Sequence, residues 1–154
     1  MDNPDTVIEV PTLSGDVVID GVPDEDFWKQ ARVVELDIET QPADNAPASV
    51  KTTAYIADNG REVLFAFRAE DPDPSKIRAF LRDRDTLWND DFIGFTIDTF
   101  NDQRRAYEFY VNPLGAQGDM IMDGASGNED DSWDGLWDSG AKINATGYTV
   151  EMRI

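Results

Sequence analysis

Residues 82–98 read RDRDTLWNDDFIGFTID, and this segment determines how the rest of the chain is interpreted. In residues 93–98, apolar side chains alternate with small or polar ones, which is the pattern of a β-strand with one buried face. Trp88 stands just before this strand, among acidic and basic residues. The segment therefore predicts a strand, and it leaves two readings for Trp88: a platform on which a ligand stacks, or a plug at the end of a core.

Similar alternation recurs along the chain, in residues 16–20, 50–57, 63–70, 105–112 and 148–154. The sequence DNG at residues 58–60 predicts a hairpin between two of these segments. Two short helices are expected, in residues 23–31 with Asp24 as N-cap and in residues 71–81 with Pro74 in the first turn. Short strands separated by Gly, Pro and Asp turns predict an all-β fold. We expect an antiparallel β-sandwich, immunoglobulin-like or jelly-roll-like, with one or two short helices.

Charge and composition narrow the classes of function. The chain of 154 residues suits one domain, and its 32 acidic against 13 basic residues give a formal net charge of −19. Such a field repels phosphate backbones, so no nucleic-acid partner is expected. No apolar run is long enough to span a bilayer. The N-terminus, MDNPDTVIEV, lacks the basic region and apolar core of a signal peptide, which fits a mature N-terminus or a cytoplasmic start.

Missing residue types argue against most kinds of catalysis. The chain has no histidine and no cysteine, which excludes Ser-His-Asp and Cys-His catalysis and a thiolate or imidazole zinc site. Paired carboxylates can hydrolyse glycosides, but among 32 acids a chance pair at a useful distance is expected. No nucleophile and base can be named, so we expect no enzymatic activity from this chain.

Clustered carboxylates raise the possibility of calcium, a hard cation that takes six to eight oxygen ligands. Residues 119–138 hold seven acids, two tryptophans and no basic residue. The candidate ligands are carboxylates at the ends of strands or in this acidic segment: Asp71, Asp98, Asp119 and Asp123. No EF-hand spacing is present, and the alternative is that these acids are simply solvated.

Aromatic residues beside planar polar side chains are typical of sugar-binding sites, because sugar C–H faces stack on rings while hydroxyls bond to the rim. Trp88 has Arg84, Asn89 and Asp91 as neighbours in sequence. Trp133 and Trp137 are spaced by four, and core packing explains them as well as ligand contact does. Trp28, in the first expected helix, is predicted to be a core residue.

Four segments in order resemble family 9 carbohydrate-binding modules and their relatives. Residues 19–31, IDGVPDEDFWKQA, resemble the opening I-D-G-x-x-D-E-x-x-W signature, and residues 52–74 resemble the hairpin that follows. Residues 88–119 resemble the W-x-x-D strand and the F-x-V-N-x-x-G strand. Residues 132–154 resemble the W-x-x-x-W segment and the closing G-Y-x-V-E-x-x-I.

The resemblance implies a β-sandwich with structural calcium and a site in which two tryptophans, a glutamate and an arginine hold a chain-terminal sugar. Trp88 matches the first tryptophan. Gly94 stands at the glutamate position and Tyr110 at the arginine position, and the second tryptophan would lie beyond Ile154. The expected carbohydrate-binding residues are Arg84, Trp88, Asn89, Asp91, Tyr110 and Trp137.

These observations predict a non-catalytic carbohydrate-binding module in residues 17–154, preceded by an extension of residues 1–16. The resemblance places it in a larger bacterial protein of carbohydrate catabolism, periplasmic, outer-membrane or secreted, fused to or associated with an outer-membrane domain or a glycoside hydrolase. The expected partner is an oligo- or polysaccharide. The alternative is a structural or interaction domain with a degenerate sugar site that docks onto a partner or membrane barrel. A heme-binding relative is disfavoured, because the chain has no histidine and only four methionines.

Overall fold

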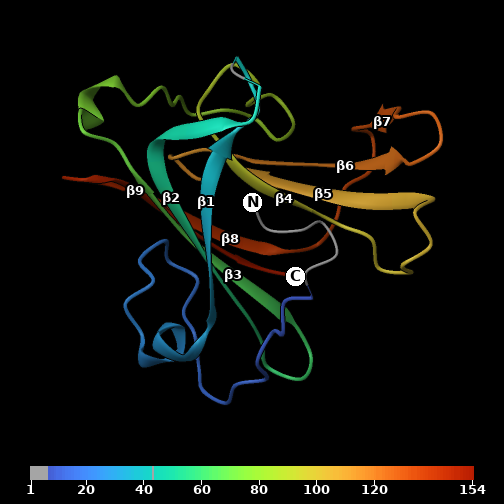
Figure 1. The fold of residues 1–154 in the computed structure, drawn as a ribbon, viewed down its shortest axis with the longest axis horizontal. Helices are drawn as coiled ribbons and strands as arrows, with labels where there is room; N and C mark the ends of the chain where they lie inside the picture. Colours follow the sequence, from blue (N-terminus) through green and yellow to red (C-terminus); the bar gives the residue numbers. More distant parts are fainter. Residues whose placement is uncertain (1–6, 43) are drawn as a thin grey trace.

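The computed structural model describes residues 7–42 and 44–154 as two antiparallel sheets facing each other (Figure 1). The five-stranded sheet has the order β1 (Arg32–Glu39), β2 (Ala46–Asp58), β3 (Val63–Glu70), β9 (Gly147–Arg153), β8 (Asp138–Asn144). The four-stranded sheet has the order β4 (Ile93–Ile97), β5 (Arg105–Val111), β6 (Gln117–Asp123), β7 (Glu129–Asp130). Two short 3-10 helices, η1 (Asp26–Gln30) and η2 (Pro74–Lys76), complete the fold. The predicted all-β antiparallel sandwich with two short helices is confirmed.

Stacked aromatic side chains join the two sheets. In β4 and β5, Phe95 lies opposite Phe109, and the two rings are 5.3 Å apart. Phe95 also stacks on Phe65 of β3 with ring centroids 3.8 Å apart. The apolar positions of β4 and β5 therefore face the core, as their alternation predicts, and the positions between them face outward.

A second core lies on the opposite face of the five-stranded sheet. Here η1 packs Phe27 and Trp28 against Leu64 of β3, and Trp28 is only 3% exposed. The prediction that Trp28 is a core residue is confirmed. The segment before η1 crosses this face so closely that a Cβ on Gly21, at φ +87°, would lie 2.6 Å from the backbone nitrogen of Ala141. Only glycine suits that position.

A buried carboxylate ties the start of the chain to its last strand. Glu151 of β9 is fully buried and accepts hydrogen bonds from Trp28 Nε1 (2.9 Å), the backbone N–H of Gly21 (2.9 Å) and that of Asp20 (3.1 Å). Burial raises the pKa of this carboxyl. The opening signature, residues 19–31, and the closing signature, which contains Glu151, are therefore joined by hydrogen bonds in the folded protein.

Three local predictions were wrong. Residues 16–20 form no strand, because side chains take its donors instead: Glu25 Oε1 accepts from the backbone N–H of Val18, and Glu151 from that of Asp20. The first helix begins at Asp26 with Glu25, not Asp24, at the N-cap, and no side chain caps it. The second is a single turn, Pro74–Lys76, rather than the expected eleven residues.

Residues just before the sandwich dock on β2. The backbone N–H of Leu13 donates to Asp58 O (2.8 Å), and the N–H of Asp58 donates to Pro11 O (3.0 Å). β1, the edge strand beside β2, leaves apolar side chains partly exposed: Val33 (48%), Leu36 (43%) and Ile38 (50%).

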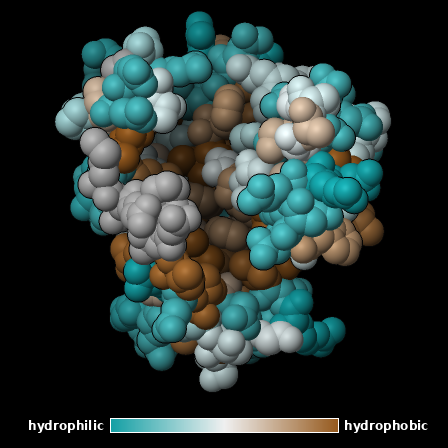
Figure 2. Space-filling model, turned by 45° about the vertical axis from the view of Figure 1, so that its right-hand side comes forward, coloured by the Kyte–Doolittle hydropathy of each residue, from teal (hydrophilic) through white to brown (hydrophobic). Residues whose placement is uncertain are grey.

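The molecule is hollowed on the side seen in Figure 2, where the hydrophobic floor has hydrophilic residues above it and to its right and hydrophobic residues below it. No helix formed by residues 7–42 or 44–154 is both long and apolar enough to cross a membrane.

Candidate functional site

The outer face of the four-stranded sheet carries the candidate ligand site. The register pairs Gly94 of β4 with Tyr110 of β5, and Tyr110 with Gly118 of β6. Because side chains alternate along each strand, these three positions and Met120 share the face that points away from Phe95 and the core. Glycine on both sides of Tyr110 leaves this face open to larger side chains.

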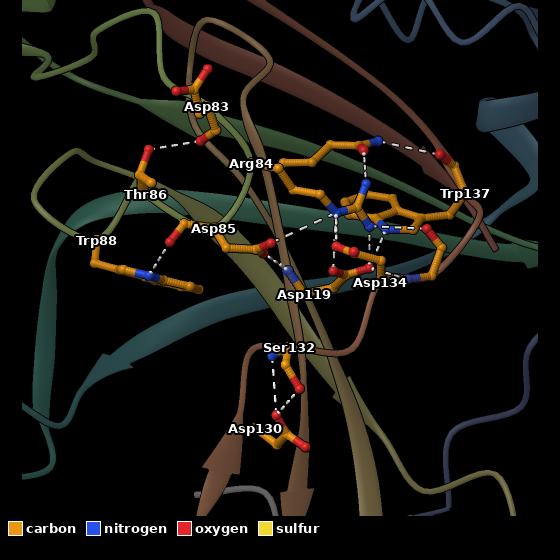
Figure 3. A network of polar contacts seen from close by, with 12 residues as sticks. Asp83, Arg84, Asp85, Thr86, Trp88, Asp119, Asp130, Ser132, Asp134 and Trp137 are labelled. Carbon is orange, nitrogen blue, oxygen red and sulfur yellow. Dashed lines mark hydrogen bonds and ion pairs between the residues drawn. The ribbon is translucent and has the colours of Figure 1, made fainter.

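A loop before β4 brings Trp88 onto this face. Its backbone is anchored to β6, because the N–H of Asp85 donates to Gln117 O (3.0 Å) and Asp85 Oδ1 accepts from the N–H of Asp119 (2.9 Å). The indole N–H of Trp88 donates to Asp85 O (2.8 Å), as Figure 3 shows. A Cβ at Gly118 would lie only 3.1 Å from the ring of Trp88, so the glycine makes room for it.

Three rings meet there, Trp88, Phe92 and Tyr110, called here the aromatic trio. Their centroids are 5.4 to 6.0 Å apart, and every pair is nearly perpendicular, with interplanar angles of 81° to 85°. Trp88 is 36% exposed and Phe92 40% exposed. The ring of Tyr110 lies across Gly94, because a Cβ at Gly94 would come within 2.2 Å of Tyr110 Cδ1. The trio therefore depends on glycine at position 94.

A pocket of about 490 Å³ opens beside the trio. Its lining consists of the three rings, one apolar side chain and two carboxylates: Trp88, Phe92, Tyr110, Met120, Glu129 and Asp131. Two hollows have larger volumes. One of about 530 Å³, at the β1–β2 end, has no aromatic lining residue, and one of about 510 Å³ has a single aromatic lining residue, Trp137. Aromatic walls with a few polar groups are the usual composition of a small-ligand site, so we take the pocket beside the aromatic trio as the candidate site.

The hydroxyl of Tyr110 is held by a hydrogen bond to a buried carboxylate. It donates to Oε2 of Glu108 (3.2 Å), a residue that is only 4% exposed. Burial, followed by the charge of Glu108, raises the pKa of Tyr110 to about 12. The phenol therefore stays neutral at physiological pH, and its ring is held in place for stacking.

On the core side of the same sheet lies a polar network centred on Arg84. Asp119, whose side chain is fully buried, accepts hydrogen bonds from the Arg84 guanidinium, the N–H of Gly135 (2.8 Å) and Trp137 Nε1 (2.8 Å). The guanidinium also contacts Asp134 (3.0 Å), and Figure 3 shows it pointing away from Trp88. Arg84 and Trp137 therefore stabilise the fold behind the pocket.

The carboxylates of Asp85, Asp119 and Asp134 lie within 4.8 Å of one another and could hold a metal ion. Arg84 already supplies a positive charge at this place, because it contacts all three. Burial raises the pKa of Asp85. A cation entering the cluster would have to displace the guanidinium.

The structure separates the predicted sugar-binding residues. Trp88 and Tyr110 line the pocket, whereas Arg84 and Trp137 belong to the network behind it. Asn89 is exposed beside Trp88. Asp91 fixes the loop rather than the pocket wall, since its Oδ2 accepts from the backbone N–H of Arg78 (2.9 Å) and its own N–H donates to Arg78 O (2.7 Å).

Of the predicted metal ligands, only Asp119 joins the carboxylate cluster. Asp98, Asp123 and Asp71 each accept backbone N–H groups of the turn that follows them, for example Gln103 N to Asp98 (2.8 Å). Asp85 and Asp134 were not predicted, and neither were the pocket residues Phe92, Met120, Glu129 and Asp131. Glu129 and Asp131 lay in the acidic segment, but composition alone does not show which of its acids face a cavity.

No protein-family model and no curated protein matches the chain. Two solved structures share its fold. A family 9 carbohydrate-binding module from Caldicellulosiruptor kristjanssonii, in complex with cellotriose, superimposes with a TM-score of 0.64 at 16% identity, over 94% of this chain and 66% of that one. A protein from Bacteroides uniformis ATCC 8492, to which carbohydrate binding has been ascribed, has a TM-score of 0.65 at 16% identity, over 82% of this chain and 61% of that one.

At this identity the likeness establishes the fold: the chain is folded like a family 9 carbohydrate-binding module. It spans about two thirds or less of each of the two proteins.

Proposed function

We propose that this chain is a non-catalytic carbohydrate-binding module, and that its ligand, an oligo- or polysaccharide, binds in the pocket beside the aromatic trio. The observation that carries the proposal is the pocket itself: three rings, two of them exposed and the third half-buried, with carboxylates at the rim. The shared fold with a module bound to cellotriose supports it.

Each side chain has a physical role in this proposal. A pyranose ring stacks its C–H face on Trp88, while the carboxylates of Glu129 and Asp131 accept hydrogen bonds from sugar hydroxyls. Sugar hydroxyls are already bonded to water, so each exchange yields little free energy. We therefore expect a dissociation constant near millimolar, about −4 kcal/mol, for short neutral oligosaccharides.

The test is an NMR titration with cellotriose and with glycans selected on an array, using wild type, Trp88→Ala and Phe100→Ala. Phe100 is a matched control, because it is an aromatic residue 73% exposed in the turn after β4. We expect Trp88→Ala to abolish the shifts and Phe100→Ala to retain them. If no glycan perturbs any resonance at high millimolar concentration, the carbohydrate proposal is wrong.

A second candidate is an interaction domain, which the exposed apolar side chains of edge strand β1 favour. Replacing Leu36 by lysine would then weaken association with a fused or partner domain without changing any glycan titration. Retained association in that variant would contradict this candidate.

We also propose that the chain works outside the cytoplasm, within a secreted or outer-membrane bacterial protein of carbohydrate catabolism, attached to a glycoside hydrolase or another domain. The sequence resemblance supports this setting, and the absence of cysteine is compatible with it. Immunoblots of fractionated source cells test it, and signal confined to the cytoplasm would contradict it.

For calcium, we propose Asp85, Asp119 and Asp134 as the ligand set, in competition with Arg84. Because the guanidinium and Ca²⁺ would share the same oxygens, Arg84→Met should strengthen calcium-dependent stabilisation. At a hundredfold excess over the dissociation constant, that stabilisation is about 2.7 kcal/mol. Asp134→Asn in the Arg84→Met background should remove most of it. Identical melting midpoints in calcium, magnesium and chelator for every variant would exclude a calcium site.

A further inference from the structure

All charged residues that line the pocket beside the aromatic trio are negative. Its polar lining groups are the carboxylates of Glu129 and Asp131, and none of its lining residues among those described is basic. A third carboxylate, Glu108, lies just beneath, bonded to the hydroxyl of Tyr110. Neutral sugar hydroxyls do not require such an arrangement.

Two of the three arginines in the loop before β4 are paired with other carboxylates, and no ion pair joins Glu129 or Asp131 to a basic residue within residues 7–42 and 44–154. Arg82 is bonded to Asp90 (2.9 Å), and Arg84 is bonded to Asp119 on the core side of the sheet. Both guanidinium groups are thus committed elsewhere. The charge at the pocket rim is left for a ligand to balance.

From this geometry we propose that the pocket selects saccharides that carry a protonated amine, that is, glycans with free amino sugars such as glucosamine. The inference rests on the proposed carbohydrate function and specifies its ligand class. An ammonium group offers three donors for the carboxylates of Glu129 and Asp131. The same charge is attracted to the face of an aromatic ring, most strongly to that of tryptophan.

The perpendicular packing of the trio favours this ligand over a flat neutral one. Because each pair of rings meets at 81° to 85°, the pocket offers ring faces in more than one direction. One face can stack on the pyranose while another attracts its ammonium group. The position of Glu129 supports this arrangement, because Glu129 lines the same pocket as Trp88 and Tyr110.

The experiment compares three trisaccharides with the same β-1,4 backbone that differ only at carbon 2. Cellotriose carries a hydroxyl, chitotriose an N-acetyl group, and the glucosamine trimer an ammonium group. NMR titrations are run at about pH 5.5, where most carboxylates are ionised. We expect the glucosamine trimer to bind about tenfold more tightly than the two neutral sugars. Raising the salt concentration should reduce that preference.

Substitutions separate the pocket from the general negative field of the protein. Glu129→Gln/Asp131→Asn should bring the affinity for the glucosamine trimer within about twofold of that for cellotriose in the same variant. Asp37→Asn, an exposed position on β1, is compared with Glu129→Gln because each removes one negative charge. Asp37→Asn should retain the preference for the glucosamine trimer over cellotriose.

The outcomes distinguish the two proposals. Equal binding of cellotriose and the glucosamine trimer would overturn the amine selectivity and leave the carbohydrate proposal standing. A preference that persists in Glu129→Gln/Asp131→Asn and in Trp88→Ala would also overturn it, because the attraction would then come from net charge. Failure of all three sugars to bind would overturn the amine selectivity, and the carbohydrate proposal would fall with it only if the array-selected glycans also cause no resonance shifts.

Discussion

Replacing Glu151 by alanine should destabilise the fold by about 3 to 5 kcal/mol. The substitution leaves three buried donors without their acceptor: the indole N–H of Trp28 and the backbone N–H groups of Gly21 and Asp20. Each unsatisfied buried donor costs roughly 1 to 3 kcal/mol. Relief of the buried charge offsets part of that sum, which sets the expected value near its lower end.

Urea denaturation measures this cost, and Trp28→Phe isolates one of the three bonds. That variant keeps an aromatic ring and removes only the donor, so about 1 to 2 kcal/mol is expected. In the double variant Glu151→Ala/Trp28→Phe the second change should cost little, because its partner is already absent. A loss of less than about 1 kcal/mol in the free energy of unfolding of Glu151→Ala would refute the reasoning. So would a double variant whose loss equals the sum of the losses in the two single variants.

The pH dependence gives a second signature of the same residue. Burial raises the pKa of Glu151, so the folded protein holds this proton more tightly than the unfolded chain does. The contribution of Glu151 to stability is therefore lost as pH rises from the unfolded pKa, about 4.3, through the folded one. Glu151→Gln should remove this decline, and an unchanged pH profile in that variant would contradict the assignment.

Three further predictions concern the site and its supports. Trp28→Ala should cost about 3 to 5 kcal/mol in urea denaturation because Trp28 is buried, and Trp88→Ala clearly less; equal losses would make Trp88 a core residue. Hydrogen bonding to Arg82 lowers the pKa of Asp90 to about 2, so wild type should lose stability as pH falls from about 4 towards 2. Thermal melts of Asp90→Asn should lack that acid-induced loss, and its persistence would contradict the assignment. Gly94→Ala should cost about 1 to 3 kcal/mol and weaken ligand shifts, since the new methyl group collides with the pocket ring of Tyr110; unchanged binding would place the ligand elsewhere.

Strand prediction succeeded where one face of a strand meets the core. In β4 and β5, apolar side chains alternate with outward-facing ones, and the structure places them accordingly. β9 keeps the same alternation, although the second core also buries its other face. Strand prediction missed β1 and β8 because both are edge strands, where exposed positions on both faces blur the alternation. It also missed β6, because the central Asp119 reads as a loop residue until its buried partners are known.

The candidate site could be predicted in part. The position of Trp88 at the mouth of β4 was evident from the sequence, and so was the unusual pair Gly94 and Tyr110. The partners of Asp119 were not, because Arg84 lies 35 positions away in the chain and only the fold brings the two together. The number of carboxylates indicates that a positive charge lies nearby, but it does not distinguish a metal ion from the guanidinium group of an arginine.

Tyr110 and Gly94 constrain the order in which this site could be converted into a chain-terminal sugar site. Starting with Gly94→Glu would place the new side chain where the Tyr110 ring already lies, within 2.2 Å at the first carbon. Starting with Tyr110→Arg removes the two ring carbons that lie nearest to the new Cβ, and the Phe109 carbonyl oxygen, at 2.7 Å, is the next contact that the strand pairing must accommodate. An evolving lineage or a protein engineer would therefore find the route passable in one direction, with position 110 changing before position 94.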